Sequence, residues 1–82
     1  MRELIEFLAK SLVNNPDEVQ VSEREEGDTT IFELRVASDD MGKVIGKQGK
    51  IAKAIRTLVR AVSTKDSRRV NVEIIDRNEP AK

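Results

Sequence analysis

Two segments in which apolar residues occupy every second position, 30–36 and 68–75, lie on either side of a long helical stretch. The apolar positions are Phe32, Leu34 and Val36 in the first segment, and Val70, Val72 and Ile74 in the second. A period of two predicts β-strands that bury one face. Because two helical segments separate these strands, the connection is long enough for the last strand to lie parallel to a neighbour in one sheet.

Residues 18–25 predict a further strand, which is more exposed than the other two. They alternate at Val19 and Val21 and are otherwise polar. Residues 26–28 form a predicted turn, whose glycine supplies the positive φ that a tight reversal often needs. The strand at 18–25 therefore pairs with the strand at 30–36 as a β-hairpin.

An amphipathic helix is predicted over residues 2–14. Its apolar residues fall at helical spacing: Leu4, Ile5, Leu8 and Leu12, with Phe7 beside them. The helix ends at Asn14-Asn15-Pro16, because the residue before a proline is disfavoured in the helical region. We expect Phe7 and Phe32, the only aromatic residues of the chain, to occupy core positions.

Two more helices are predicted between the hairpin and the last strand. Ser38, Asp39 and Asp40 are candidate N-caps for a short helix that passes through Val44 and breaks at Gly46. A longer helix starts near residue 50 and runs to about residue 63. Its predicted core stripe consists of Ile51, Ile55, Leu58 and Val62, and its opposite face carries Lys53, Arg56 and Arg60.

The order helix, strand, strand, helix, helix, strand predicts a two-layer α+β domain, with a three-stranded sheet packed against helices on one face. We expect residues 1–77 to form this single domain and residues 78–82 to be a flexible tail. The chain of 82 residues contains neither cysteine nor histidine, so we expect no catalysis, no metal and no cofactor. An N-terminus without a signal peptide and the lack of a long apolar run predict a cytoplasmic protein without a membrane segment.

Charge is strongly segregated along the chain, although its net charge is zero. Residues 1–40 contain eleven acidic and four basic residues, a balance of −7. Residues 41–65 contain seven basic residues and no acidic residue, a balance of +7. Mixed signs are typical of an ordinary solvated face, so this separation predicts a local cationic surface for an anionic partner.

Gly46-Lys47-Gln48-Gly49 joins the two helices at the centre of this cationic segment. The start of a helix favours anions, and glycines let a sugar-phosphate chain approach the backbone. Together with Lys50 and Lys53, the loop predicts a site for an extended polyanion. A nucleotide-binding P-loop is excluded by the glycine spacing and by Ile51, which follows Lys50 where that motif requires Ser or Thr.

The stretch from Met41 to Arg56 (MGKVIGKQGKIAKAIR) resembles the signature of a KH domain, whose GXXG loop clamps a backbone of four nucleotides. The predicted element order resembles the type II arrangement of this domain. The opening helix, the sequence NPDEV at 15–19 and residues 45–56 are similar to the KhpA (YlqC) family of small bacterial single-KH-domain RNA-binding proteins.

The resemblance implies a single-stranded RNA-binding protein whose loop residues and Lys53 hold the backbone. Arg56 could extend this phosphate track or be solvated, whereas Arg60 is expected to be mostly solvated. The resemblance also implies a shallow aliphatic groove for bases. Its candidate lining consists of Val44, Ile45, Ile51 and Ile31, each of which could instead belong to the core.

The resemblance also implies a post-transcriptional regulator or an RNA chaperone, linked to bacterial cell elongation and division. The resemblance further implies a homodimer, or a heterodimer with a larger multidomain KH protein. In the alternative interpretation, the chain acts mainly as a protein-interaction module through such dimers. Small residues on one flank of the longer helix would permit a close approach of two helices: Ala54, Thr57 and Ala61.

Overall fold

The computed structural model describes residues 1–63 and 69–79. The helices are α1 (Arg2–Leu12), α2 (Met41–Ile45) and α3 (Lys50–Val62), and the strands are β1 (Gln20–Glu26), β2 (Thr29–Val36) and β3 (Arg69–Asp76). Three short 3-10 turns join them: η1 (Pro16–Glu18), η2 (Ser38–Asp40) and η3 (Lys47–Gly49). The predicted α-β-β-α-α-β order of a type II KH domain is confirmed.

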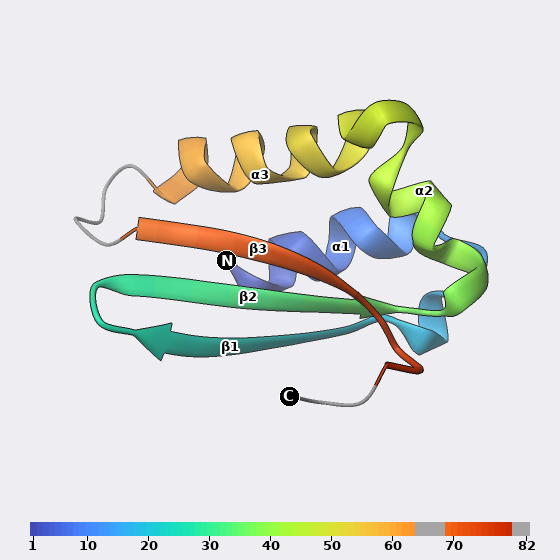
Figure 1. Ribbon diagram of the computed structural model, residues 1–82, viewed down its shortest axis with the longest axis horizontal. Helices are drawn as coiled ribbons and strands as arrows, with labels where there is room; N and C mark the ends of the chain where they lie inside the picture. The colour runs from blue at the N-terminus through green and yellow to red at the C-terminus, as the bar shows by residue number, and fades with distance from the viewer. Residues whose placement is uncertain (64–68, 80–82) are drawn as a thin grey trace.

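The strands form one sheet in the order β1-β2-β3 (Figure 1). β1 and β2 are antiparallel, which confirms the predicted hairpin, and Val21 lies opposite Leu34. β2 and β3 are parallel, with Phe32 opposite Val72. The parallel pairing follows from the crossover through α2 and α3, which returns the chain to the end of the sheet where β2 began.

All three helices pack against the same face of the sheet. The core lies between them and β2, whose buried residues on this face include the predicted Phe32, Leu34 and Val36. Ile5 and Ala9 of α1, Val44 of α2, Ile55 and Val59 of α3 and Val72 of β3 complete its centre. Among the residues that the structure describes, no helix covers the other face of the sheet.

The predicted core stripes of α1 and α3 are partly wrong. In α3 the buried residues are Ala52, Ile55 and Val59, whereas Leu58 and Val62 are 40% and 51% exposed. Because Ala52 is small, the start of α3 lies close to the core. The buried face of the helix is therefore centred on this residue and not on the predicted stripe. In α1 the fully buried residues are Ile5 and Ala9, and Phe7 is 67% exposed. The prediction that both phenylalanines are buried therefore holds only for Phe32.

Asp40 occupies the N-cap position of α2, as predicted, but its side chain makes no capping hydrogen bond there. Its carboxylate is fully buried and accepts hydrogen bonds from the backbone amides of Asn14 and Asn15 and from Asn15 Nδ2. Burial alone would raise the pKa of Asp40, but these three donors and the charge of Lys43 outweigh it and hold the pKa below its usual value. The side chain therefore ties the end of α1 to the start of α2.

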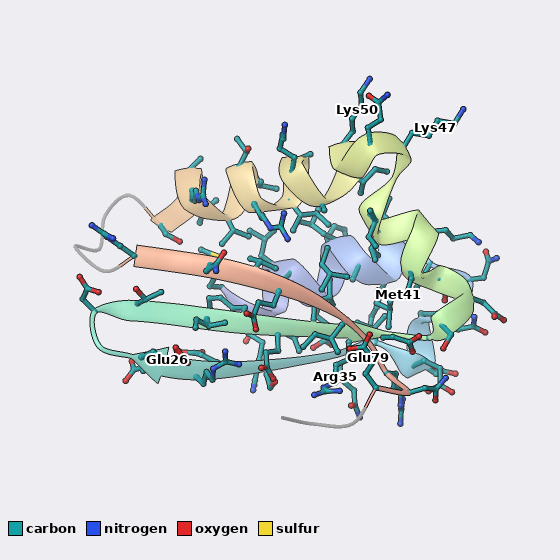
Figure 2. All side chains as sticks on the ribbon, in the orientation of Figure 1. Glu26, Arg35, Met41, Lys47, Lys50 and Glu79 are labelled. Atoms are coloured by element: carbon teal, nitrogen blue, oxygen red, sulfur yellow. The ribbon has the colours of Figure 1, made fainter. Side chains whose placement is uncertain are left out.

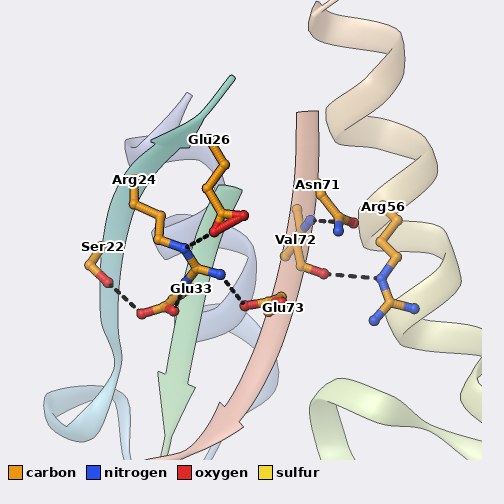
Figure 3. A network of polar contacts seen from close by, with 8 residues as sticks. All are labelled: Ser22, Arg24, Glu26, Glu33, Arg56, Asn71, Val72 and Glu73. Carbon is orange, nitrogen blue, oxygen red and sulfur yellow. Dashed lines mark hydrogen bonds and ion pairs between the residues drawn. The ribbon is translucent and has the colours of Figure 1, made fainter. Parts of the chain in front are cut away.

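The open face of the sheet carries a network of charged side chains (Figure 3). Arg24 of β1 forms ion pairs with Glu26, with Glu33 of β2 and with Glu73 of β3, and so connects all three strands. Exposed ion pairs of this kind contribute little to stability individually, at most about 1 kcal/mol. Arg35 also lies on this face, so both signs of charge are interspersed there.

The first two residues of the predicted flexible tail are held in place. The Asn78 amide donates to Asp76 Oδ1, and Asn78 Nδ2 donates to Ser38 Oγ. The Glu79 amide donates to the Asp76 carbonyl. Residues 80–82, which complete the predicted tail, lie outside the described residues.

Candidate nucleic-acid interface

The glycine loop follows an unusual backbone path between α2 and α3. Gly46, Gln48 and Gly49 have φ values of 75°, 58° and 74°. Left-handed conformations are rare for residues with a Cβ, and Gln48 adopts one at a cost of about 1 kcal/mol or more. Such local strain is typical of functional sites, since folding alone rarely favours it.

Some amides of this loop are free and others are not. Gly49 donates to the Gly46 carbonyl at 3.2 Å, and Lys50 donates to the Lys47 carbonyl. Within the described ranges, no hydrogen bond is found for the amides of Lys47 and Gln48, and no side chain caps the start of α3. The loop therefore presents two adjacent unpaired donors at the positive end of a helix.

Gly46 is required by a close contact as well as by its backbone conformation. A Cβ at this position would lie 2.5 Å from Ile51 Cγ1 and 3.1 Å from the Ile51 backbone nitrogen. At Gly49 a Cβ would meet nothing within 4 Å, so only the positive φ favours glycine there. The first glycine of the loop thus fixes the approach of α3, and the second completes the turn.

The cationic side chains surround the loop on its exposed side. Lys47, Gln48, Lys50 and Lys53 are exposed, and Figure 2 shows Lys47 and Lys50 extending away from the body of the domain. No acidic residue occurs between residues 41 and 63. These side chains and the unpaired amides form one electropositive surface, as the segregation of charge predicts.

The structure separates the four candidate residues of the base groove. Ile45 and Ile51 flank the loop and are half-buried, so part of each remains accessible. Val44 is fully buried in the core and does not line a surface. Ile31 lies on the open face of the sheet, opposite Arg24 and Asn71, because it is out of phase with the core residues of β2. Of the four candidates, only Ile45 and Ile51 are therefore accessible beside the loop.

Arg56 is more constrained than the sequence indicates. It is half-buried, and its Nε donates a hydrogen bond of 3.2 Å to the Val72 carbonyl of β3 (Figure 3). Arg60 is exposed, as expected, and no ion pair or hydrogen bond of its side chain occurs in the part of the chain that the structure describes. Helical periodicity places both arginines on one face and could not distinguish them, because the contact of Arg56 depends on a strand 16 residues away.

The three small residues of the predicted dimer surface, Ala54, Thr57 and Ala61, are all exposed on α3. Leu58 and Val62, which the predicted stripe placed in the core, lie on the same side of the helix. The outer surface of α3 is consequently more apolar than expected.

Two further observations concern the described residues as a whole. None of their helices has the length and apolar character needed to cross a bilayer. No group of three or more acidic residues among them is arranged to hold a metal ion.

A comparison with protein families matches residues 2–74 to the KH domain of KhpA and KhpB. The chain belongs to the KhpA/KhpB KH-domain family. The match covers the three helices, the glycine loop, β1 and β2, and β3 as far as Ile74.

Similar proteins agree with membership of the KhpA/KhpB family. The chain is 61% identical over 75 residues to the RNA-binding protein KhpA of Clostridium acetobutylicum, covering 92% of this chain and 100% of that protein. It is 54% identical over 74 residues to the RNA-binding protein KhpA of Borreliella burgdorferi, covering 90% of each chain.

The fold also occurs within a larger protein. A crystal structure of Aquifex aeolicus Era matches with a TM-score of 0.62 and 22% identity, covering 92% of this chain and 29% of Era. A structure of Era in complex with nucleotides of 16S ribosomal RNA matches with a TM-score of 0.59 and 21% identity, covering 96% of this chain and 32% of that one. At this level of identity the likeness concerns the fold alone.

Proposed function

We propose that this protein binds single-stranded RNA without catalysis, and that its glycine loop clamps the sugar-phosphate backbone. The observation that carries the proposal is the conjunction at one loop of two unpaired amides, positive φ values and exposed cations. Gly46 and Gly49 leave room for the strand, Lys47 and Gln48 present their amides and side chains, and Lys50 and Lys53 neutralise phosphates. The family and the names of its KhpA members support RNA as the ligand.

Bases then lie beside the loop, on the accessible parts of Ile45 and Ile51, with Val44 beneath them in the core. Aromatic stacking has a small role in this proposal, because Phe32 is buried and Phe7 lies on α1. The cellular role that fits such a small cytoplasmic RNA-binding module is post-transcriptional regulation or RNA chaperoning, linked to cell elongation and division.

The salt dependence of binding tests the proposed backbone contacts. If three or four phosphates are neutralised, log K falls with log salt at a slope of about −2 to −3, using roughly −0.7 per contact for single strands. Fluorescence anisotropy with a labelled random RNA of about eight nucleotides, titrated between about 50 and 300 mM KCl, measures this slope. A slope near zero would contradict the proposal, since phosphate contacts release counterions.

A second function is favoured by the apolar outer surface of α3. We propose that two copies of the chain pair through it, with Leu58 and Val62 as the apolar centre and Ala54, Thr57 and Ala61 as the small residues that permit close approach. A single KH domain contacts few bases, so pairing raises affinity through effective concentration. The same surface would serve a heterodimer with a larger multidomain KH protein.

Leu58→Glu should convert the dimer into a monomer, because it places a charge at the centre of the apolar surface. Sedimentation equilibrium at about 100 µM should show a dissociation constant raised at least roughly tenfold. Phe7→Glu is the matched control, since Phe7 is an exposed apolar residue on α1 and should leave the dimer intact. A wild-type protein that is monomeric at this concentration would refute the proposed homodimer.

A further inference from the structure

At Val72, two side chains of the protein itself occupy the outer edge of β3. Within residues 1–63 and 69–79, β3 pairs with β2 alone, so this other edge has no partner strand there. At Val72 both backbone groups on this edge are occupied: the amide donates to Asn71 Oδ1 at 3.0 Å, and the carbonyl accepts from Arg56 Nε at 3.2 Å. A ligand that reaches this edge at Val72 therefore meets the outer atoms of Arg56 and Asn71 before it meets the backbone.

These outer atoms are all hydrogen-bond donors. Arg56 uses only its Nε in the described contact, so Nη1 and Nη2 remain, and Asn71 uses its Oδ1, so Nδ2 remains. Figure 3 shows the two amino groups of Arg56 directed away from the Val72 carbonyl, toward the end of the domain that carries α2. The glycine loop lies at the same end (Figure 1).

Arg56 is within reach of an RNA strand held at the loop. It follows Gly49 by seven residues, about 10 Å along the axis of α3 at 1.5 Å per residue. Its side chain also borders a hollow of about 830 Å³ that extends over the open face of the sheet, where Glu33 and Glu73 line it together with Arg24. With the backbone held by the unpaired amides and the lysines of the loop, bases that turn inward would reach Arg56 at the edge of β3.

We propose that Arg56, supported by Asn71, is a specificity-determining residue that selects bases with two adjacent acceptors. Guanine presents such a pair in O6 and N7, and cytosine in N3 and O2, and the Arg56 amino groups match their spacing as a planar fork. In adenine and uracil, the acceptors that this fork would reach each lie next to a donor. That donor would face the donors of Arg56 and Asn71. The hydrogen bond to Val72 holds the guanidinium in place, so little rotamer freedom is lost on binding.

This inference rests on the proposed RNA-binding function and deepens it by naming the class of base. Labelled octamers in matched pairs test it: (UG)4 against (UA)4, and C8 against U8. The wild-type protein should bind the first member of each pair about tenfold more tightly, within the range that one bidentate contact provides. Anisotropy titrations at fixed salt concentration measure the two ratios.

Arg56→Lys is the decisive variant, because lysine retains the charge and loses the fork. Both ratios should fall to about one, with the salt slope unchanged, whereas a merely structural role of Arg56 would weaken all four RNAs equally. Arg60→Lys is the matched control and should preserve both ratios. Wild-type ratios near one, or ratios that persist in Arg56→Lys, would overturn this inference alone. Absence of binding to all four RNAs would overturn the proposed function and this inference with it.

Discussion

Replacing Lys47 and Gln48 together with aspartate should abolish RNA binding and leave the fold intact. Both side chains are exposed, and no ion pair or hydrogen bond connects either of them to another described residue. Aspartate also tolerates the left-handed backbone at Gln48, where φ is 58°. The double change places two negative charges beside the proposed phosphate position, and like charges at an interface cost several kcal/mol. Affinity should fall at least about 100-fold.

The measurement combines RNA titration with circular dichroism and thermal melting. Arg60→Asp is the control, because it introduces a comparable charge change on α3 about 16 Å along the axis from Gly49. Its affinity should change far less than that of the double variant. If the double variant binds RNA within about twofold of the wild type, the loop is not the binding site.

Replacing Gly46 with alanine should cost both stability and RNA binding. The added methyl group would lie 2.5 Å from Ile51 Cγ1, and the backbone at φ 75°, ψ 175° is accessible to glycine almost alone. To relieve this contact, Ile51 and the start of α3 must move. This movement would also displace Lys50 and Lys53, which belong to the proposed RNA-binding site. We expect a loss of roughly 2–4 kcal/mol in the free energy of unfolding, of the size typical for overpacking combined with backbone strain.

The other glycines of this region provide graded controls in urea denaturation. Gly49→Ala should cost about 1 kcal/mol, because its φ is 74° but the space around it is open. Gly42→Ala should be neutral or stabilising by up to about 1 kcal/mol, since Gly42 lies within α2 and a Cβ there meets nothing. If Gly46→Ala unfolds at the same urea concentration as Gly42→Ala, the close contact with Ile51 does not constrain the loop.

The order of helices and strands along the chain, the hairpin and the loop could be predicted from the sequence because they depend on local patterns. Alternation at Phe32, Leu34 and Val36 identifies β2 whatever packs against it, and the crossover restricts how β3 can pair. Two glycines between helical segments likewise indicate a turn without knowledge of the remaining fold. The overall class of the domain could therefore be predicted from sequence patterns.

The face that each helix buries could not be predicted from the sequence. In α3, apolar residues occur on two adjacent flanks, so periodicity alone could not decide which of them faces the sheet. Alanine carries little hydrophobic signal, and yet Ala9 and Ala52 mark the places where α1 and α3 approach the core. The choice of face depends on the shape of the sheet surface, which only the assembled fold defines.

The contacts of Asp40 and Arg56 were missed for a related reason. Asp40 bonds to the amide of Asn14, 26 residues earlier, and Arg56 bonds to Val72, 16 residues later. Near the start of a predicted helix, the capping role is the obvious local interpretation of an aspartate. No local pattern signals that the same carboxylate is completely enclosed and serves another part of the chain.

The cationic surface around the glycine loop, in a chain whose acidic residues are concentrated in segment 1–40, governs how the molecule meets a polyanion. Because the net charge of the protein is zero, its long-range attraction to a polyanion is weak. Its uneven charge distribution nevertheless produces a torque that turns the lysines toward the polyanion. Orientation thus precedes contact, while long-range attraction adds little to the collision frequency. Ions in solution should accordingly act mainly by shortening the lifetime of the bound state rather than by slowing encounters.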